Sequence, residues 1–335
     1  MIRLYWKELL DLKPYKIVMT GSLYPQALAA LEEQCEIKKW EGPGPIPREQ
    51  LLDWLQDADG LVSTGNVKVD GELLAAAPQL RVIAQSSVGY DNVDIQACTA
   101  KGVPFGNTPG VLVETVADLT YALLLAAARR IHDGWEMVKS GRWTPGAAVP
   151  FGVDPYGKTL GIVGMGDIGS AVARRAQASG MNVIYHNRSR REDDQALGTR
   201  YVQFDELLAE SDFIVVLVPL SASSKGMFDR DQFAKMKPSA YFINASRGSI
   251  VNTEALYEAL RTGGIAYAAL DVTDPEPLPV DHPLIALPNV LITPHVGSAT
   301  HETRGRMSDL TAANLLAGLA GKPMPACVNS SAQRI

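Results

Sequence analysis

The 335-residue sequence has little cysteine and little histidine, and both shortages exclude kinds of site. Its 3 cysteines, Cys35, Cys98 and Cys327, are odd in number and far apart, which argues against a disulfide framework and against a cysteine zinc site. They fit a reducing cytoplasm best. No pair of its 5 histidines has metal-ligand spacing with carboxylates nearby, so we expect no bound metal.

Long runs of positive charge and of apolar residues are also missing. The formal net charge is -6, and no Lys/Arg stretch could build the basic face that a phosphate backbone requires, so we expect no nucleic-acid partner. The most apolar stretch, Val111 to Ala128, is interrupted by Glu114 and Asp118, so we expect a buried helix and no membrane partner. The first segment, Met1 to Pro14, lacks the apolar core of a signal peptide, and we expect a short extension there.

The sequence contains two series of alternating strand and helix patterns, and its length favours two domains. This alternation predicts α/β domains with parallel sheets covered by helices. In the first series the expected strands are 16–19, 61–63 and 81–85, and the expected helices are 26–33, 48–56 and 71–77. In the second series the expected strands are 160–163, 182–185, 213–218, 241–244, 267–270 and 290–293.

Six strands complete a dinucleotide-binding sheet, so the second series predicts a Rossmann domain over residues 111–299. The final helical pattern, Ser308 to Leu319, is too short for a third domain, and we expect it to pack on the first. The substrate domain is then discontinuous and flavodoxin-like, with residues 1–110 plus 300–335. The pattern from Val113 to His132 is helical and apolar on more than one face, which predicts a helix covered by another domain and by a second subunit.

A glycine fingerprint follows the first strand of the second series. It is Gly164-Met165-Gly166-Asp167-Ile168-Gly169, and its setting of strand, turn, helix and next strand makes the motif specific. Gly164 permits a tight turn, Gly166 lets a pyrophosphate approach the backbone, and Gly169 lets helix and strand pack closely. The helix N-terminus adds unpaired N–H groups. The alternative is a tight turn that holds no ligand.

The end of the next strand predicts which nicotinamide cofactor is used. An NAD site needs Asp or Glu there to bind the ribose 2′-hydroxyl. This chain has His186-Asn187-Arg188-Ser189-Arg190-Arg191 instead, which would attract a 2′-phosphate. We therefore expect NADP(H) to be preferred, with NAD(H) also possible. The alternative for these arginines is an exposed basic turn.

Three residues at strand ends fit the reduction of a 2-keto acid. Arg247 follows the strand 241–244 and can bind a carboxylate with its planar fork. His295 follows the last strand and can donate a proton to the carbonyl oxygen, while Glu276, in a proline-rich loop, can favour the charged imidazole. Taken singly, each could be a surface ion-pair partner, a solvated charge or a hydrogen-bonded histidine; their joint occurrence behind a nucleotide fingerprint favours catalysis.

These motifs resemble the D-isomer-specific 2-hydroxyacid dehydrogenase family over residues 16–325. The resemblance rests on Val163 to Gly169, Phe242 to Gly248, Leu270 to Pro277 and Pro294 to Thr300. Two further segments, Glu276 to Pro279 and Leu315 to Pro325, are most similar to the glyoxylate/hydroxypyruvate reductases within that family.

The resemblance implies further site residues and an assembly. It implies catalysis by Arg247, Glu276 and His295, a homodimer built on the dinucleotide domains, and backbone N–H groups of Ser87-Val88-Gly89 that hold the substrate carboxylate. It also implies that Asp271 holds the nicotinamide amide and that Ser298 lines the substrate pocket. We further assign cofactor contacts to the fingerprint residues and to Asn187, Arg188, Ser189, Pro219, Ala245, Asp271, His295 and Gly297.

The expected function is the reduction of glyoxylate or hydroxypyruvate to the D-2-hydroxy acid with NADPH. Rivals with the same chemistry are pyruvate (giving D-lactate), 2-ketogluconate and 3-phosphoglycerate; the last would need basic residues that Ser86 to Asp94 lacks. A rival of another class is a dinucleotide-sensing binding protein like the corepressors of this fold. Turnover above about 1 s⁻¹ would favour the enzyme.

Overall fold

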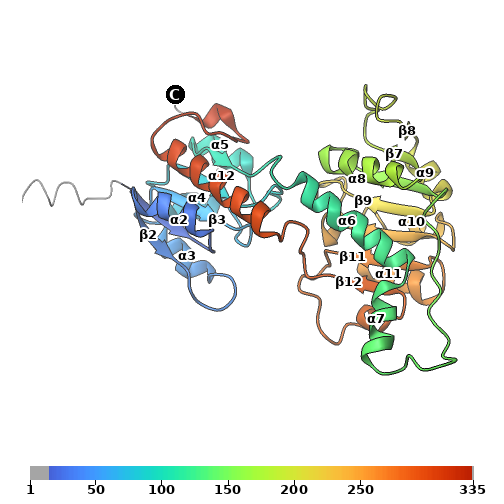
Figure 1. Cartoon of the computed structure of the whole chain (residues 1–335). Coiled ribbons are helices and arrows are strands. Elements are labelled where there is room, and N and C mark those ends of the chain that lie inside the picture. The colour runs from blue at the N-terminus through green and yellow to red at the C-terminus, as the bar shows by residue number, and fades with distance from the viewer. Residues whose placement is uncertain (1–14, 334–335) are drawn as a thin grey trace, which may run out of the picture. The chain divides into compact units, whose positions relative to one another are not determined.

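The computed structural model describes residues 15–333, and the expected extension Met1–Pro14 lies outside them. The chain forms two compact units. The first contains the described residues up to Leu112 together with those from Ala299 onward, and the second is Val113–Ser298. Figure 1 labels the elements of both units. Each unit has its own sheet and its own cores.

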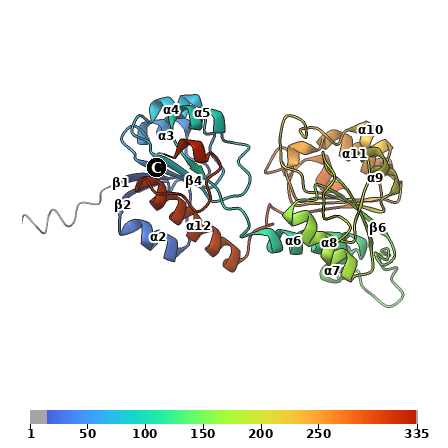
Figure 2. The same cartoon turned by 90° about the horizontal axis from the view of Figure 1, so that it is seen from above.

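The first unit is a parallel sheet with helices on both faces. The strand order is β2-β1-β3-β4-β5, and Figure 2 shows α2 and α12 on one side of the sheet and α3, α4 and α5 on the other. The strands are β1 Tyr15–Met19, β2 Cys35–Lys39, β3 Gly60–Ser63, β4 Val82–Gln85 and β5 Phe105–Gly106. The helices are α2 Pro25–Glu32, α3 Arg48–Trp54, α4 Gly71–Ala76, α5 Ile95–Lys101, α12 His301–Leu319 and the 3₁₀ helix η3 Ser330–Ala332.

Side-chain alternation along the strands explains these two layers. In β1, Ile17 and Met19 belong to the cluster that contains Leu315 of α12, whereas Val18 belongs to the cluster that contains Leu51 of α3. Successive side chains of a strand point to opposite faces, so the apolar run Ile17 to Met19 must be covered on both sides. The C-terminal helix therefore completes a core that the first strand begins.

The second unit is a larger parallel sheet with the order β12-β11-β10-β9-β6-β7-β8. Its strands are β6 Thr159–Val163, β7 Asn182–His186, β8 Arg200–Tyr201, β9 Phe213–Val216, β10 Tyr241–Asn244, β11 Tyr267–Leu270 and β12 Val290–Ile292. Its helices are α6 Val113–Ala128, α7 Ile131–Lys139, α8 Asp167–Ala178, α9 Phe204–Glu210, α10 Arg230–Ala234, α11 Thr253–Arg261, η1 Gly248–Ile250 and η2 Pro283–Ala286. The order reverses at β6, which places a ligand crevice beside the carboxyl end of that strand.

The prediction of one helix from Val113 to His132 is wrong at its end. Helix α6 stops at Ala128, and Arg130 has a left-handed backbone with φ 53° before α7 begins. The Arg130 guanidinium stabilises this break because it pairs with Asp133 at 2.6 Å and lies 5.1 Å from the centre of the Tyr267 ring. The prediction of six strands in this sheet also misses one, because the short edge strand β8 is a seventh.

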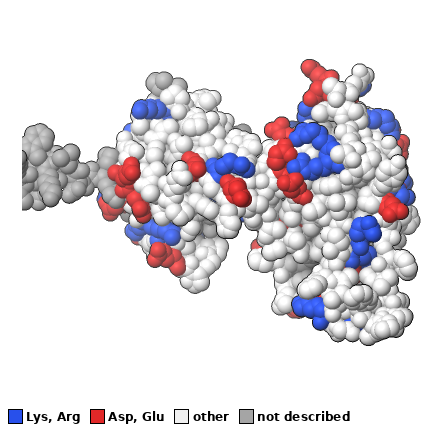
Figure 3. Space-filling model, in the orientation of Figure 1, with Lys and Arg blue, Asp and Glu red and all other residues white. Residues whose placement is uncertain are grey.

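Charged side chains of both signs are interspersed on the visible face of each unit (Figure 3). Many belong to ion pairs, such as Arg175 with Glu114 and Asp118 on α6. In the part of the chain that the structure describes, no helix combines the length and the apolar character needed to cross a membrane. Among residues 15–333, no cluster of three or more His, Cys, Asp or Glu side chains could hold a metal ion.

Candidate active site

The glycine turn between β6 and α8 has the geometry of a phosphate cradle. Gly164 has φ +104°, and a Cβ atom there would lie 2.7 Å from the backbone of Leu217 and Val218. A Cβ on Gly169 would lie 2.4 Å from the Gly164 carbonyl, so only glycine lets α8 start this close to β6. A Cβ on Gly166 would meet nothing within 4 Å, and no side chain caps the helix. The helix N–H groups and the open side of Gly166 fit a dinucleotide pyrophosphate.

In the loop after β7, some polar side chains contact the glycine turn and others are exposed to solvent. The side-chain oxygen Oδ1 of Asn187 accepts a hydrogen bond from the Met165 N–H at 2.7 Å, so this residue fixes the turn. Arg190 pairs with the buried Asp194, and Arg191 pairs with Asp193. Arg188, in contrast, is exposed and has no polar protein partner within the described residues. It is thus the arginine of this loop that remains available to an added anion.

Arg247 follows β10 in a turn that other polar groups hold. The buried Asn244 side chain accepts from the Ser246 N–H at 3.1 Å and donates to the Arg247 carbonyl at 3.0 Å. The Ser246 hydroxyl donates to the Val218 carbonyl, which ties the turn to the end of β9. Asn244 and Ser246 were not singled out by the sequence analysis, although a buried amide that ends an apolar strand was a usable signal.

Glu276 and His295, two of the predicted catalytic residues, form a close pair in the second unit. The Glu276 Oε1 atom lies 2.6 Å from the His295 Nδ1 atom, and the Glu276 Oε2 atom accepts from the Thr273 N–H at 3.3 Å. Both side chains are partly exposed, at 41% and 46% respectively. With Nδ1 engaged by the carboxylate, Nε2 is the ring nitrogen left for a substrate.

The electrostatics favour the ionised form of Glu276. Burial acts to raise the pKa of this carboxyl, but the hydrogen bond and charge of His295, the Thr273 N–H and the charge of Arg247 together hold the pKa below its ordinary value. The carboxylate is therefore charged at neutral pH.

Asp271, which follows β11, organises the turn that carries His295. Its buried carboxylate accepts from the Thr293 hydroxyl at 2.6 Å and from the backbone N–H groups of Val296 and Gly297 at 2.8 Å each. The His295 N–H donates to the Asp271 carbonyl at 3.0 Å, and His295 has the left-handed φ of 51°. Thr293 is a third residue that sequence reasoning missed, because its partner Asp271 follows a different strand.

The other predicted site residues lie in two places. Val88 and Gly89 belong to the first unit, in the loop after β4. Four predicted residues follow strands of the second unit: Pro219 after β9, Ala245 after β10, and Gly297 and Ser298 after β12. In the second unit, therefore, the predicted catalytic and cofactor residues follow the carboxyl ends of strands, as expected for an α/β sheet.

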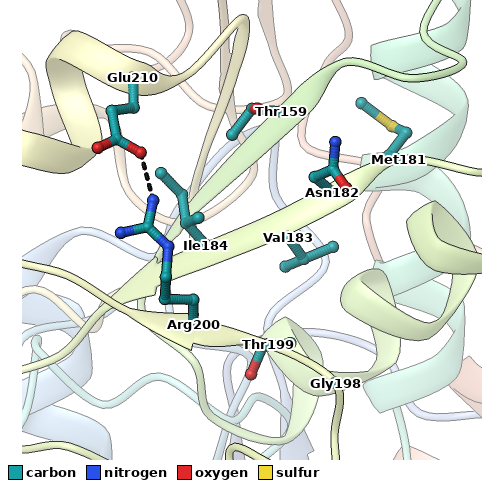
Figure 4. Close-up of a pocket in the computed structure, with 9 residues that line it drawn as sticks. All are labelled: Thr159, Met181, Asn182, Val183, Ile184, Gly198, Thr199, Arg200 and Glu210. Atoms are coloured by element: carbon teal, nitrogen blue, oxygen red, sulfur yellow. Dashed lines mark hydrogen bonds and ion pairs between the residues drawn. The ribbon is translucent and has the colours of Figure 1, made fainter.

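A separate hollow of about 530 Å³ lies at the amino ends of β6, β7 and β8 (Figure 4). It is lined by the first residues of β6, β7 and β8, namely Thr159, Asn182 and Arg200, and the Arg200 guanidinium pairs with Glu210 at its side. Arg247, Glu276 and His295 follow the opposite ends of strands, so the predicted catalytic residues do not line this hollow.

Comparison with known proteins gives consistent matches. Residues 121–297 match the family model described as D-isomer specific 2-hydroxyacid dehydrogenase, NAD binding domain. A glyoxylate reductase of Korarchaeum cryptofilum is 43% identical over 327 residues, 97% of this chain and 98% of the relative. Glyoxylate/hydroxypyruvate reductase B of Serratia proteamaculans is 44% identical over 321 residues, 95% of this chain and 98% of the relative.

A solved structure extends these matches to three dimensions. It is an NADPH-dependent glyoxylate/hydroxypyruvate reductase of Sinorhizobium meliloti in complex with NADP and malonate. Its chain has a TM-score of 0.85 and 34% identity to this one, and the match covers 96% of this chain and 98% of that chain.

Proposed function

The chain belongs to the D-isomer-specific 2-hydroxyacid dehydrogenase family, and from that premise we propose that it reduces glyoxylate or hydroxypyruvate to the D-2-hydroxy acid with NADPH. As a member it is an oxidoreductase with a nicotinamide-dinucleotide-binding domain, and its relatives support the reduction of 2-keto acids. The observation that carries the proposed chemistry is the contact of 2.6 Å between Glu276 and His295.

The three proposed catalytic residues have distinct tasks. Arg247 binds the substrate carboxylate through its planar guanidinium and so orients the keto group. His295 holds a proton on Nε2 and donates it to the carbonyl oxygen as that oxygen gains negative charge. Glu276 accepts the hydrogen bond from Nδ1–H, which fixes the orientation of the ring and leaves Nε2 for the substrate.

The remaining proposed contacts hold the dinucleotide and the substrate. When bound, the reduced nicotinamide supplies the hydride that the carbonyl carbon receives. The glycine turn holds the pyrophosphate, Asp271 holds the nicotinamide amide, and Val88, Gly89 and Ser298 contact the substrate. Further proposed cofactor contacts are Asn187, Arg188, Ser189, Pro219, Ala245, His295 and Gly297.

The free guanidinium of Arg188 supports the preference for NADPH. Its neighbours Arg190 and Arg191 are paired with carboxylates, whereas Arg188 and Ser189 are exposed and have no polar protein partner within residues 15–333. An arginine and a hydroxyl at the end of the second Rossmann strand suit a 2′-phosphate.

A substrate and cofactor panel tests the proposal. Glyoxylate, hydroxypyruvate, pyruvate and 2-ketogluconate are assayed with NADPH and NADH by loss of nicotinamide absorbance. We expect the highest kcat/KM for glyoxylate or hydroxypyruvate with NADPH. A faster reaction with pyruvate or 2-ketogluconate would overturn the substrate assignment, and turnover far below about 1 s⁻¹ for every pair would favour a dinucleotide-sensing protein.

Arg188→Ala tests the cofactor preference separately. We expect KM for NADPH to rise at least tenfold and KM for NADH to stay within about twofold, because only NADPH presents a 2′-phosphate. Arg190→Ala is the matched control, since Arg190 is already paired with Asp194. The preference would be refuted if the unmodified enzyme has a KM for NADH equal to or lower than its KM for NADPH, and if Arg188→Ala changes neither value.

We propose further that the protein is a homodimer in a reducing cytoplasm. Residues 131–156 of the second unit expose several large apolar side chains, with Phe151 89% and Tyr156 79% exposed. Exposed apolar surface of this kind marks an interaction site, and a second copy is the usual partner. The three cysteines are free thiols, which suits a reducing compartment.

A further inference from the structure

In the loop after β4, the backbone carbonyl groups of Ser87, Val88 and Gly89 accept hydrogen bonds from residues of the first unit. The Ser87 carbonyl accepts from the Thr108 N–H at 3.0 Å, and the Val88 carbonyl accepts from the Asn107 side chain at 2.9 Å. The Gly89 carbonyl accepts twice, from the Gln85 amide at 2.9 Å and from the Ser87 hydroxyl at 2.6 Å. Three successive carbonyls are thus held by neighbouring groups.

The N–H groups of the same loop are not used in this way. Within the described residues, none of the backbone N–H groups of Ser87, Val88 and Gly89 donates to a protein acceptor. Backbone polar groups need partners, and successive unpaired N–H groups in a turn form an anion-binding concavity. A loop whose carbonyls are occupied can offer only its donors to a ligand.

A pair of amide side chains supports this arrangement from inside the unit. Gln85 ends β4 and is fully buried. Its Nε2 atom lies 3.1 Å from the Asn92 Oδ1 atom, and the Asn92 Nδ2 atom donates back to the Gln85 Oε1 atom at 2.9 Å. Asn92 also donates to the Val67 carbonyl at 2.7 Å, which fixes the pair to the preceding loop. The buried Gln85 amide thus has hydrogen-bond partners at both Oε1 and Nε2, and satisfied polar networks of this kind rigidify the groups that they join.

We propose that Gln85, Asn92 and Asn107, with the Ser87 hydroxyl, are positioning residues that turn the N–H groups of this loop toward the substrate carboxylate. This inference rests on the proposed function, because it concerns how the substrate of that reaction is held. None of the four side chains touches the reacting atoms. Each acts by accepting or donating hydrogen bonds that fix the loop.

Two substitutions test the proposal. Ser87→Ala removes the hydroxyl that binds the Gly89 carbonyl, and Gln85→Met keeps the length of the side chain but removes its amide. We expect each to raise KM for glyoxylate at least tenfold, with kcat and KM for NADPH changed less than about threefold, because the loop binds ground and transition states alike. Ser87→Thr, which keeps the hydroxyl, is expected to retain the original KM.

A buried amide elsewhere in the same unit provides the control. Asn329 bonds Phe105, Val103 and Thr99, none of which belongs to the loop. Asn329→Leu is expected to lower the melting temperature and leave KM for glyoxylate unchanged. If Gln85→Met does not fold, Ser87→Ala and Ser87→Thr decide the question by themselves.

Binding of oxalate, an unreactive dicarboxylate, separates this inference from the proposed function. Calorimetry on the protein with bound NADP should show Kd for oxalate rising at least tenfold in Ser87→Ala and Gln85→Met, and not in Asn329→Leu. The positioning role would be overturned if KM for glyoxylate and Kd for oxalate are unchanged in Ser87→Ala and Gln85→Met. It would also be overturned if Asn329→Leu has equal effects, or if the unmodified protein does not bind oxalate. Oxalate binding without turnover of any 2-keto acid would overturn the proposed function instead.

Discussion

His295 combines a chemical task with an unfavourable backbone. Its φ of 51° lies in the left-handed region, which costs a residue with a side chain roughly 1–2 kcal/mol. The Asp271 carbonyl and carboxylate hold the turn in this shape through the N–H groups of residues 295, 296 and 297. Backbone strain of this kind is found where a side chain must have one orientation.

Two substitutions at His295 separate the chemical role from the backbone. His295→Ala and His295→Asn should each lower kcat by about 10²–10⁴, because both remove the acid. The affinity for NADPH should change far less, because His295 is one of many proposed cofactor contacts. Asn tolerates the left-handed region better than Ala, so His295→Asn should melt at the higher temperature. A loss of kcat below tenfold would remove His295 from the mechanism, and the reverse order of melting would contradict the account of the turn.

Glu276→Gln tests the charge beside His295 at nearly constant size. Without the carboxylate the His295 ring loses the charged acceptor that fixes its orientation, so kcat for reduction should fall by about 10- to 100-fold. The pKa of Glu276 in the folded protein lies below its ordinary value, so its stabilising effect is present at neutral pH and is lost as pH falls through the folded pKa. The difference in Tm between the two proteins should therefore shrink from about pH 7 to about pH 3. A kcat within threefold of that of the unmodified protein would contradict the role of Glu276.

At the scale of elements, the start of α8 depends on two glycines for different reasons. Gly169→Ala would place a Cβ 2.4 Å from the Gly164 carbonyl and force α8 away from β6, which should cost about 1–3 kcal/mol of stability. Gly166→Ala meets no protein atom, so it should leave Tm unchanged but raise KM for NADPH, because the Cβ occupies the proposed phosphate cradle. Thermal melts and cofactor titrations of the two variants check these expectations. Equal losses of Tm in Gly169→Ala and Gly166→Ala would contradict the separate roles of the two glycines.

The sequence predicted the central elements better than the edges. The buried strands β3, β4, β6 and β9 to β11 are apolar runs, and the expected ranges match them within two residues. The edge strand β2 was missed because Glu36, Lys38 and Lys39 interrupt its apolar pattern, as is common at edges. Helix α12 starts at His301, seven residues before the predicted Ser308, because the Thr300 side chain caps it there.

The site was predicted only as far as local patterns reach. The glycine fingerprint and the residues at strand ends have recognisable neighbours in sequence, so Gly164, Arg247, Glu276 and His295 could be named. The contact of Thr293 with Asp271 spans 22 residues, and that of Asn107 with Val88 spans 19. Such partners depend on which strands become neighbours, and spacing along the chain does not contain that information.

At the scale of the whole molecule, the proposed dimer depends on residues 131–156 of the second unit. Trp135→Glu combined with Phe151→Glu places two charges on this segment, where the side chains are 59% and 89% exposed. We expect a monomer by sedimentation at micromolar concentration, because a buried unpaired charge opposes association. Val280→Glu changes an equally exposed apolar residue outside the segment and should leave the dimer intact. An unmodified protein that sediments as a monomer would refute the assembly.

The return of the chain to its first sheet sets the order of events during synthesis. Leu315 and Leu319 of α12 pack with Ile17 and Val82, yet they leave the ribosome after all of residues 113–298. At translation rates of roughly 5–20 residues per second, that apolar surface waits on the order of ten to forty seconds for its cover. During most of its synthesis the nascent chain therefore exposes the apolar face of the first sheet that α12 later covers. We expect chaperones to bind mainly to the N-terminal third of the chain.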